Sequence, residues 1–150
     1  MKRLLIAIGL ITLLTGCTSV QTSSELTMQQ LDVDAAEKSV QQFVRSAQQE
    51  NGVYLCQDEQ NNIYYVMLNG VNMVQGDSAL TFSDVEVKGE EESLTITYSE
   101  DLIKDMEGKK LANQLLYKIK LNKDYETLKL FKNGEESHFH TITIGGNEHE

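Results

Sequence analysis

Residues 94–98 read LTITY and residues 115–121 read LLYKIKL, and these two stretches decide the fold class. The even-numbered positions of the first are apolar and alternate with threonines. The odd-numbered positions of the second are apolar and alternate with Lys118 and Lys120. A period of two places every second side chain on the same face of a strand. Each stretch therefore predicts a strand with one buried and one solvated face.

Short runs of the same kind continue in both directions, with turn residues between them. The predicted strands are residues 53–57, 63–68, 71–74, 79–88, 94–98, 115–121, 127–132 and 135–144. Strands at this spacing, joined mainly by hairpins, are typical of an antiparallel β-sandwich or a small barrel. We therefore predict a mainly β fold of about eight strands.

Two Asn-Gly pairs are typical of two-residue hairpin turns. Asn69-Gly70 predicts that residues 71–74 form a strand after the turn, and Asn133-Gly134 predicts a hairpin that sets Lys132 opposite Glu135 and Leu128 opposite Phe139. In the run 79–88 the apolar positions change phase near Ser83-Asp84, which predicts a β-bulge. Residues 99–114 are less regular, and we expect a short helix near 100–106.

One amphipathic helix is predicted near the N-terminus, at about residues 33–49. Apolar residues at 36, 40, 43, 44 and 47 fall on one helical face. Asp34 and Glu37 have the spacing of a capping box. The apolar face predicts docking on the domain that follows. A rigid stalk or a partner-binding helix is the alternative.

The chain is strongly acidic, which limits its partners. It has 150 residues, enough for one domain, and a formal net charge of -10. Two of its 13 cations, Lys2 and Arg3, precede Gly16, whereas all 23 acidic residues follow it. The remainder therefore carries -12. Nucleic acid and anionic headgroups would repel such a domain, so we expect no nucleic-acid partner.

Residues 1–16, MKRLLIAIGLITLLTG, have the pattern of a signal peptide. Lys2 and Arg3 are followed by an apolar stretch, residues 4–14, that is shorter than the ~20 residues a spanning helix needs. The next motif, Leu14-Thr15-Gly16-Cys17, resembles the lipobox of bacterial lipoproteins. That resemblance covers about 17 residues. It implies cleavage between Gly16 and Cys17, and a lipid on the Cys17 thiol that anchors the chain on the extracytoplasmic side of the cell membrane.

The sequence predicts four segments along the chain. Residues 1–16 are predicted to be a lipoprotein signal peptide, and residues 17–31, rich in Ser, Thr and Gln, a lipidated Cys with a flexible tether. Residues 32–144 are predicted to be a single β-rich globular domain. Residues 145–150 are predicted to be a disordered tail.

Candidate site residues are few. His138 and His140 would point to one face of a strand, as metal ligands need, but Lys129 would lie opposite His138, so they are weak candidates. Tyr54, Tyr64 and Tyr65 are the candidate binding face, because exposed aromatic side chains favour partner contacts. Alternation places Tyr64 and Tyr65 on opposite faces of their strand.

No catalytic residue, metal or cofactor is predicted. The chain has no glycine-rich phosphate loop, no nucleophile elbow and no helical metalloprotease motif. Cys56 is the one thiol left once Cys17 carries a lipid, and a thiol in a strand is more often a small core residue than a nucleophile. Tyr54-Leu55-Cys56 resembles the start of the membrane-bound lysozyme inhibitors, also lipoproteins, whose second Cys and Ser-Gly inhibitory loop are missing here.

The function predicted from these patterns is a membrane-anchored, non-catalytic binding or interaction module at the cell envelope. Its partner would be an envelope protein or a cell-wall component. Two alternatives stay open. One is an envelope enzyme without a recognisable local motif, which a pocket with convergent catalytic groups would favour. The other is a carrier of a small ligand or metal.

Overall fold

The computed structural model describes residues 25–74, 76, 78–104 and 111–145. Within these residues the chain forms nine strands and one helix. They are β1 (Thr27–Leu31), α1 (Lys38–Ala47), β2 (Gly52–Asp58), β3 (Ile63–Asn69), β4 (Ala79–Glu90), β5 (Ser93–Ile103), β6 (Gln114–Lys120), β7 (Thr127–Lys132), β8 (Glu135–Ser137) and β9 (Thr141–Ile144). The predicted mainly β fold with one helix near the N-terminus is confirmed.

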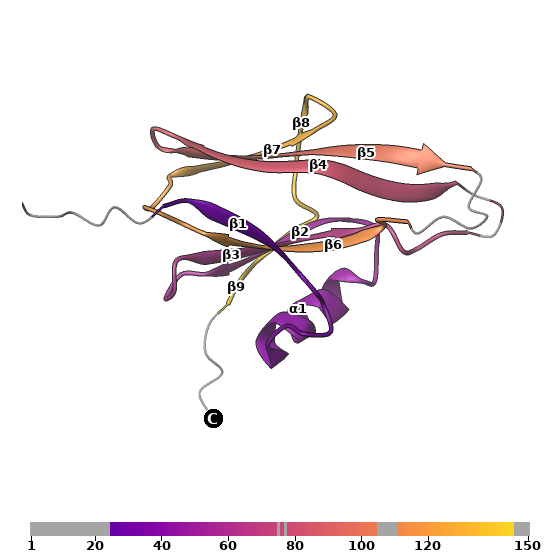
Figure 1. Ribbon diagram of the computed structural model, residues 1–150, viewed down its shortest axis with the longest axis horizontal. Coiled ribbons are helices and arrows are strands. Elements are labelled where there is room, and N and C mark those ends of the chain that lie inside the picture. The colour runs from indigo at the N-terminus through magenta and orange to yellow at the C-terminus, as the bar shows by residue number, and fades with distance from the viewer. Residues whose placement is uncertain (1–24, 75, 77, 105–110, 146–150) are drawn as a thin grey trace, which may run out of the picture.

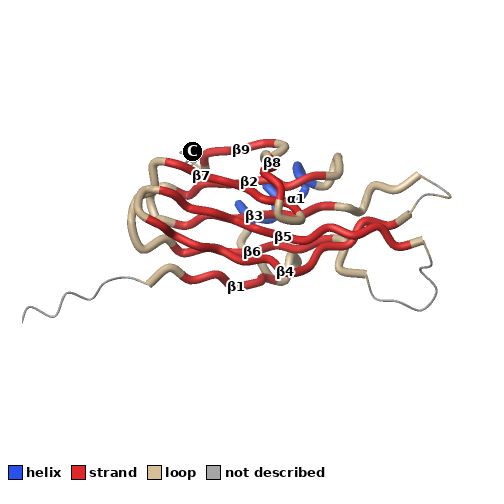
Figure 2. The backbone as a smooth tube through the Cα atoms, turned by 90° about the horizontal axis from the view of Figure 1, so that it is seen from above, coloured by secondary structure: helices blue, strands red, loops and turns tan. Residues whose placement is uncertain are grey.

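The strands form a sandwich with the helix on one outer face. One sheet has five strands in the order β1-β6-β3-β2-β9, and the other has four in the order β4-β5-β7-β8. In Figure 1 the four-stranded sheet lies above the five-stranded sheet and α1 lies below it. Figure 2 shows the strands of both sheets running along the same long axis. The five-stranded sheet is therefore the middle layer, covered on both faces.

Most strand pairs are antiparallel, as predicted, but each sheet also contains one parallel pair and is therefore mixed. β5 and β7 pair in parallel because β6, which lies between them in the chain, belongs to the other sheet. β2 and β9 also pair in parallel, because the chain leaves the four-stranded sheet after β8 and crosses to the edge of the five-stranded sheet. The predicted single strand at 135–144 is therefore divided between two sheets.

The hairpin at Asn133-Gly134 is confirmed. Asn133 and Gly134 have φ angles of 50° and 82°, as a turn with two left-handed residues requires, and Lys132 pairs with Glu135. The predicted pairing of Leu128 with Phe139 is wrong, because β8 ends at Ser137. Phe139 instead packs against the core as the chain crosses between the sheets.

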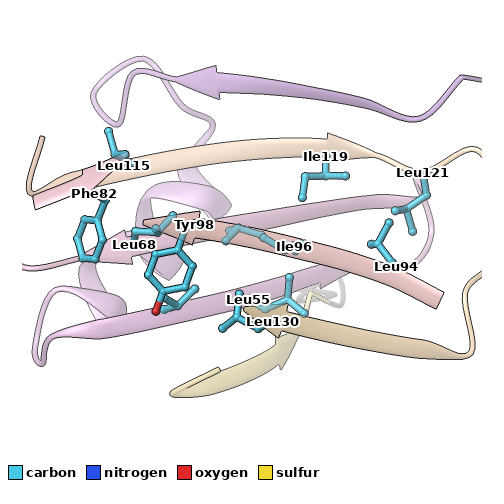
Figure 3. Packing of buried hydrophobic residues seen from close by; sticks show 12 residues of the cluster. Leu55, Leu68, Phe82, Leu94, Ile96, Tyr98, Leu115, Ile119, Leu121 and Leu130 are labelled. Carbon is cyan, nitrogen blue, oxygen red and sulfur yellow. The ribbon is translucent and has the colours of Figure 1, made fainter. Parts of the chain in front are cut away.

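The main core fills the space between the two sheets (Figure 3). The alternation in residues 94–98 is confirmed, since Leu94, Ile96 and Tyr98 are all at most 5% exposed. Ile119 of β6 and Leu55 of β2 reach the same core from the opposite sheet and are completely buried. Burial of each such side chain stabilises the fold by ~1.5–3 kcal/mol.

The predicted tether is too long, because residues 27–31 form β1. This strand pairs antiparallel with β6 along its whole length, from Thr27 opposite Lys120 to Leu31 opposite Leu116. Its sequence, TMQQL, has little apolar alternation, since an edge strand is held largely by main-chain hydrogen bonds to its neighbour. Gly145, assigned to the tail, also belongs to the domain, because its N–H donates to the Gln57 carbonyl at 2.7 Å.

The helix is shorter than predicted and starts differently. It begins at Lys38, and Asp34 does not cap it; the Asp34 N–H donates to the Asp32 carboxylate at 3.0 Å in a preceding turn. The predicted docking on the domain is confirmed. Val40, Val44 and Ala47 are at most 5% exposed and pack on the outer face of the five-stranded sheet in a second core. Tyr54, Tyr65, Met67 and Leu116 on that face of the sheet complete this core.

The predicted hairpin at Asn69-Gly70 is wrong, and residues 71–74 are not a strand. Asn69 ends β3 and is completely buried, where its Nδ2 donates to the Glu50 carbonyl at 2.8 Å. The Tyr54 hydroxyl donates to the same carbonyl at 2.9 Å. Asn69 therefore ties the segment after α1 to the sheet, instead of making a turn.

Gly70 allows a close approach between chain segments. A Cβ atom there would lie 2.7 Å from the Leu80 Cβ and 3.2 Å from a ring carbon of Phe82. We expect Gly70→Ala to destabilise the fold by about 1–3 kcal/mol through overpacking. The urea midpoint of the variant, measured by circular dichroism, checks this expectation. An unchanged midpoint would mean that the segment at Gly70 can move away from β4 without a loss of stability.

The bulge predicted near Ser83-Asp84 is confirmed. The pairing of β4 with β5 shifts between Ser83 and Glu86, and Asp84 has a φ angle of 50°. The short helix predicted near 100–106 is wrong at residues 100–103, which continue β5 opposite the start of β4. The continuous partner strand favours extended backbone there. Residues 105–106 lie outside the described part of the chain.

Candidate functional site

A groove of about 600 Å³ lies between α1 and the end of β9, and we call it the α1–β9 groove. The turn between β2 and β3 closes one end of it. The groove is lined by Glu37, Lys38, Ser39, Val40, Gln42, Phe43, Ser46, Cys56, Asp58, Gln60, Asn61, Tyr65, Thr143, Ile144 and Gly145.

Neighbouring strands form its floor. Cys56 of β2 lies directly opposite Tyr65 of β3, and alternation turns both side chains towards α1. Val40 and Phe43 cover them from the helix, so the deepest surface is apolar. The half-buried Cys56 packs in this second core, as the sequence predicted for a small core residue.

The rim is polar and carries two carboxylates and one ammonium group. Glu37 and Lys38 stand at the start of α1, and Asp58 ends β2. The Asp58 carboxylate is held in place by Asn61, whose N–H donates at 3.2 Å and whose Nδ2 donates at 2.8 Å. A polar rim around an apolar floor is the usual composition of a binding site.

The groove holds two groups whose chemistry can be described, Tyr65 and Cys56. Burial, and then the carboxylates of Glu37 and Asp58, raise the pKa of Tyr65, so its phenol stays protonated at neutral pH. Cys56 would need a base to act as a nucleophile, and the described residues that line the groove include carboxylates but no histidine. The arrangement offers an apolar floor and charged rim groups with which a bound molecule could make contact.

The three tyrosines of the candidate binding face are all at least half-buried. Tyr54 and Tyr65 are only 6% and 8% exposed, because α1 covers them. Tyr64 is half-buried against the core between the sheets. The prediction that Tyr64 and Tyr65 point to opposite faces is confirmed, and Tyr65 is the member of the set that lines the groove.

The two candidate metal ligands do not lie on a strand. Residues 138–140 connect β8 to β9, so the alternation argument fails there. His140 Nε2 lies 3.5 Å from a Glu50 carboxylate oxygen, and its ring is 4.9 Å from the ring of Tyr54. His138 is exposed. Within residues 25–145, gaps excepted, no three His, Cys, Asp or Glu side chains come together as a metal site.

A second, smaller hollow of about 360 Å³ lies at the other end of the sandwich. Asn51, Asn72, Met73, Ser78, Leu80 and Leu102 line it. Val74 is 73% exposed beside it and Leu102 is 68% exposed, so apolar surface gathers there. This end is the right-hand end in Figure 1, opposite the start of β1.

Sequence reasoning missed the α1–β9 groove. One wall is the end of β9, which the chain forms after crossing from one sheet to the other. No local sequence pattern predicts this crossing. A weak signal existed on the helix, where Ser39, Gln42 and Ser46 recur at i, i+3 and i+7. Small and polar residues at this spacing leave room beside the helix, and here they face the groove.

The predicted lipidation site, Cys17, and the cleavage position after Gly16 lie outside the described residues. Among the helices of the described part, none is long and apolar enough to cross a membrane. Comparison of the chain with protein-family models, with curated proteins and with solved structures finds no match in any of the three.

Proposed function

We propose that the chain is a membrane-anchored bacterial lipoprotein whose β domain is a non-catalytic binding module at the cell envelope, with the α1–β9 groove as its binding site. The observation that carries this proposal is the composition of the groove. Its floor is apolar, its rim is charged, and its described lining contains no histidine. These properties favour recognition over chemistry.

The anchor and the domain fit together in this proposal. Nine residues separate Cys17 from Thr27, the first residue of β1. Even fully extended, a segment of that length reaches at most roughly 30 Å, so the end of the sandwich where β1 begins would stay near the membrane. The chain after Gly16 carries a formal charge of -12, so anionic headgroups would repel the domain as a whole. The domain would therefore stand off from the lipid with the groove open to a partner.

Site-specific photo-crosslinking in intact cells tests the proposal. We expect a photoreactive amino acid at the exposed Gln42, which lines the groove, to give a defined cross-linked product with an envelope component. The matched control is the same amino acid at the exposed Lys88, on β4 of the opposite sheet. Equal products from both positions, or none from Gln42, would contradict binding at the groove.

A further inference from the structure

Strand β9 has a free edge. In the described part of the chain β9 is paired with β2 on one side and has no strand on the other. Its sequence, TITI, is uncharged, and Ile142 and Ile144 are 52% and 67% exposed. An exposed edge strand presents unpaired N–H and C=O groups that can pair with another extended chain.

The α1–β9 groove runs beside this edge. Thr143 is in register with Cys56, so its side chain faces the α1 side, and Thr143, Ile144 and Gly145 line the groove. Ile142 is in register with Leu55 and faces the opposite side. A strand added to β9 would alternate in the same way. One set of its side chains would then meet the groove, and the other set would lie beside Ile142.

We propose that β9 and the α1–β9 groove together receive an extended peptide segment of another protein, which pairs with β9 as an added strand. The side chains facing the groove are Lys or Arg, and the alternate side chains are aliphatic. Main-chain hydrogen bonds supply affinity in this binding mode, and the alternating contacts supply specificity. The inference rests on the function proposed above and names the partner's chemistry.

Charge decides between this peptide and a second copy of the chain. The rim has Glu37 and Asp58 against Lys38, and the chain after Gly16 carries -12. Two copies paired through β9 would bring two such charges together, which opposes association. A cationic segment gains from the same field, and its ammonium or guanidinium groups would reach the rim carboxylates.

The test uses the full chain in non-ionic detergent and three blocked octapeptides. They are KVKVKVKV, its acidic counterpart EVEVEVEV, and KVKPKVKV, in which proline removes an N–H from the ladder. We expect saturable binding of the first peptide in calorimetry, and at least tenfold weaker binding of the other two. Amide hydrogens of residues 141–144 should exchange more slowly when the first peptide is bound. Equal binding of all three, or no binding of the first, overturns the inference.

Two variants sharpen the test. Glu37→Gln should weaken binding of KVKVKVKV about two- to fivefold, the size of one exposed ion pair. Glu86→Gln removes the same charge from β4 of the other sheet and should leave binding unchanged. A stable dimer with slowly exchanging β9 amides would assign the edge to a second copy and overturn the inference. If cross-linking at Gln42 persists while KVKVKVKV does not bind, the inference fails and the proposed function stands.

Discussion

A chain that begins at Asp32 is expected to lose its cooperative fold, whereas a chain that begins at Glu25 keeps it. Both variants lack Cys17 and therefore the predicted lipid, so a difference in stability between them reports on residues 25–31 alone. Those residues comprise β1 and the two residues before it. The sequence pattern assigned them to a tether, so a truncation designed from the sequence would remove a strand of the five-stranded sheet.

The size of the effect follows from what β1 covers. Leu26 and Met28 pack on the core between the sheets, and Leu31 packs on the core beneath α1. Loss of three half-buried side chains and of the hydrogen-bonded edge of β6 should cost about 3–6 kcal/mol. That is comparable with the whole stability of a small domain, about 5–15 kcal/mol.

Urea unfolding followed by circular dichroism measures this difference. The chain from Glu25 should unfold in one cooperative transition. The chain from Asp32 should be largely unfolded without urea, or should aggregate through the newly exposed edge of β6. Equal midpoints for the two chains would show that β1 contributes nothing and that the tether extends to residue 31 after all.

The contrast between β1 and β6 explains how much of the fold the sequence can predict. β6 is an interior strand, paired with β1 and β3, and has a core on each face, so Leu116 and Ile119 must both be apolar. Burial of this kind produces a pattern of apolar residues from which the strand can be predicted. β1 is at an edge of the sheet, where its main chain pairs with β6 whatever side chains it carries. Glutamines therefore serve there as well as other residues. An edge strand therefore leaves little trace in the sequence.

The local sequence pattern also could not predict which of the two sheets each strand belongs to. A strand pattern gives the buried face but not the neighbouring strand, so β9 and β8 were predicted as one strand. The chain changes sheet at residues 138–140, where Phe139 turns into the core between the sheets. The groove depends on this crossing, since β9 supplies one wall of it. Tyr65 was singled out as part of a candidate binding face, but its burial under α1 was not foreseen.

Cys17→Ala is expected to abolish lipid attachment, because the thiol of Cys17 is the predicted nucleophile and no other side chain type can form the thioether. The wild-type chain should incorporate labelled fatty acid and partition into detergent when Triton X-114 separates into phases. The variant should incorporate none. It should remain at precursor size or be released from the membrane.

Cys56→Ala is the matched control, since it removes the other of the two cysteines. Cys56 is half-buried beneath α1, so its loss should leave labelling and partitioning as in the wild type. Each buried CH₂ of an acyl chain contributes ~0.8 kcal/mol, and two chains hold a protein stably where one does not. The Cys17 effect should therefore be all-or-none. A Cys17→Ala chain found at mature size in the membrane fraction would refute lipid anchoring, whatever the groove binds.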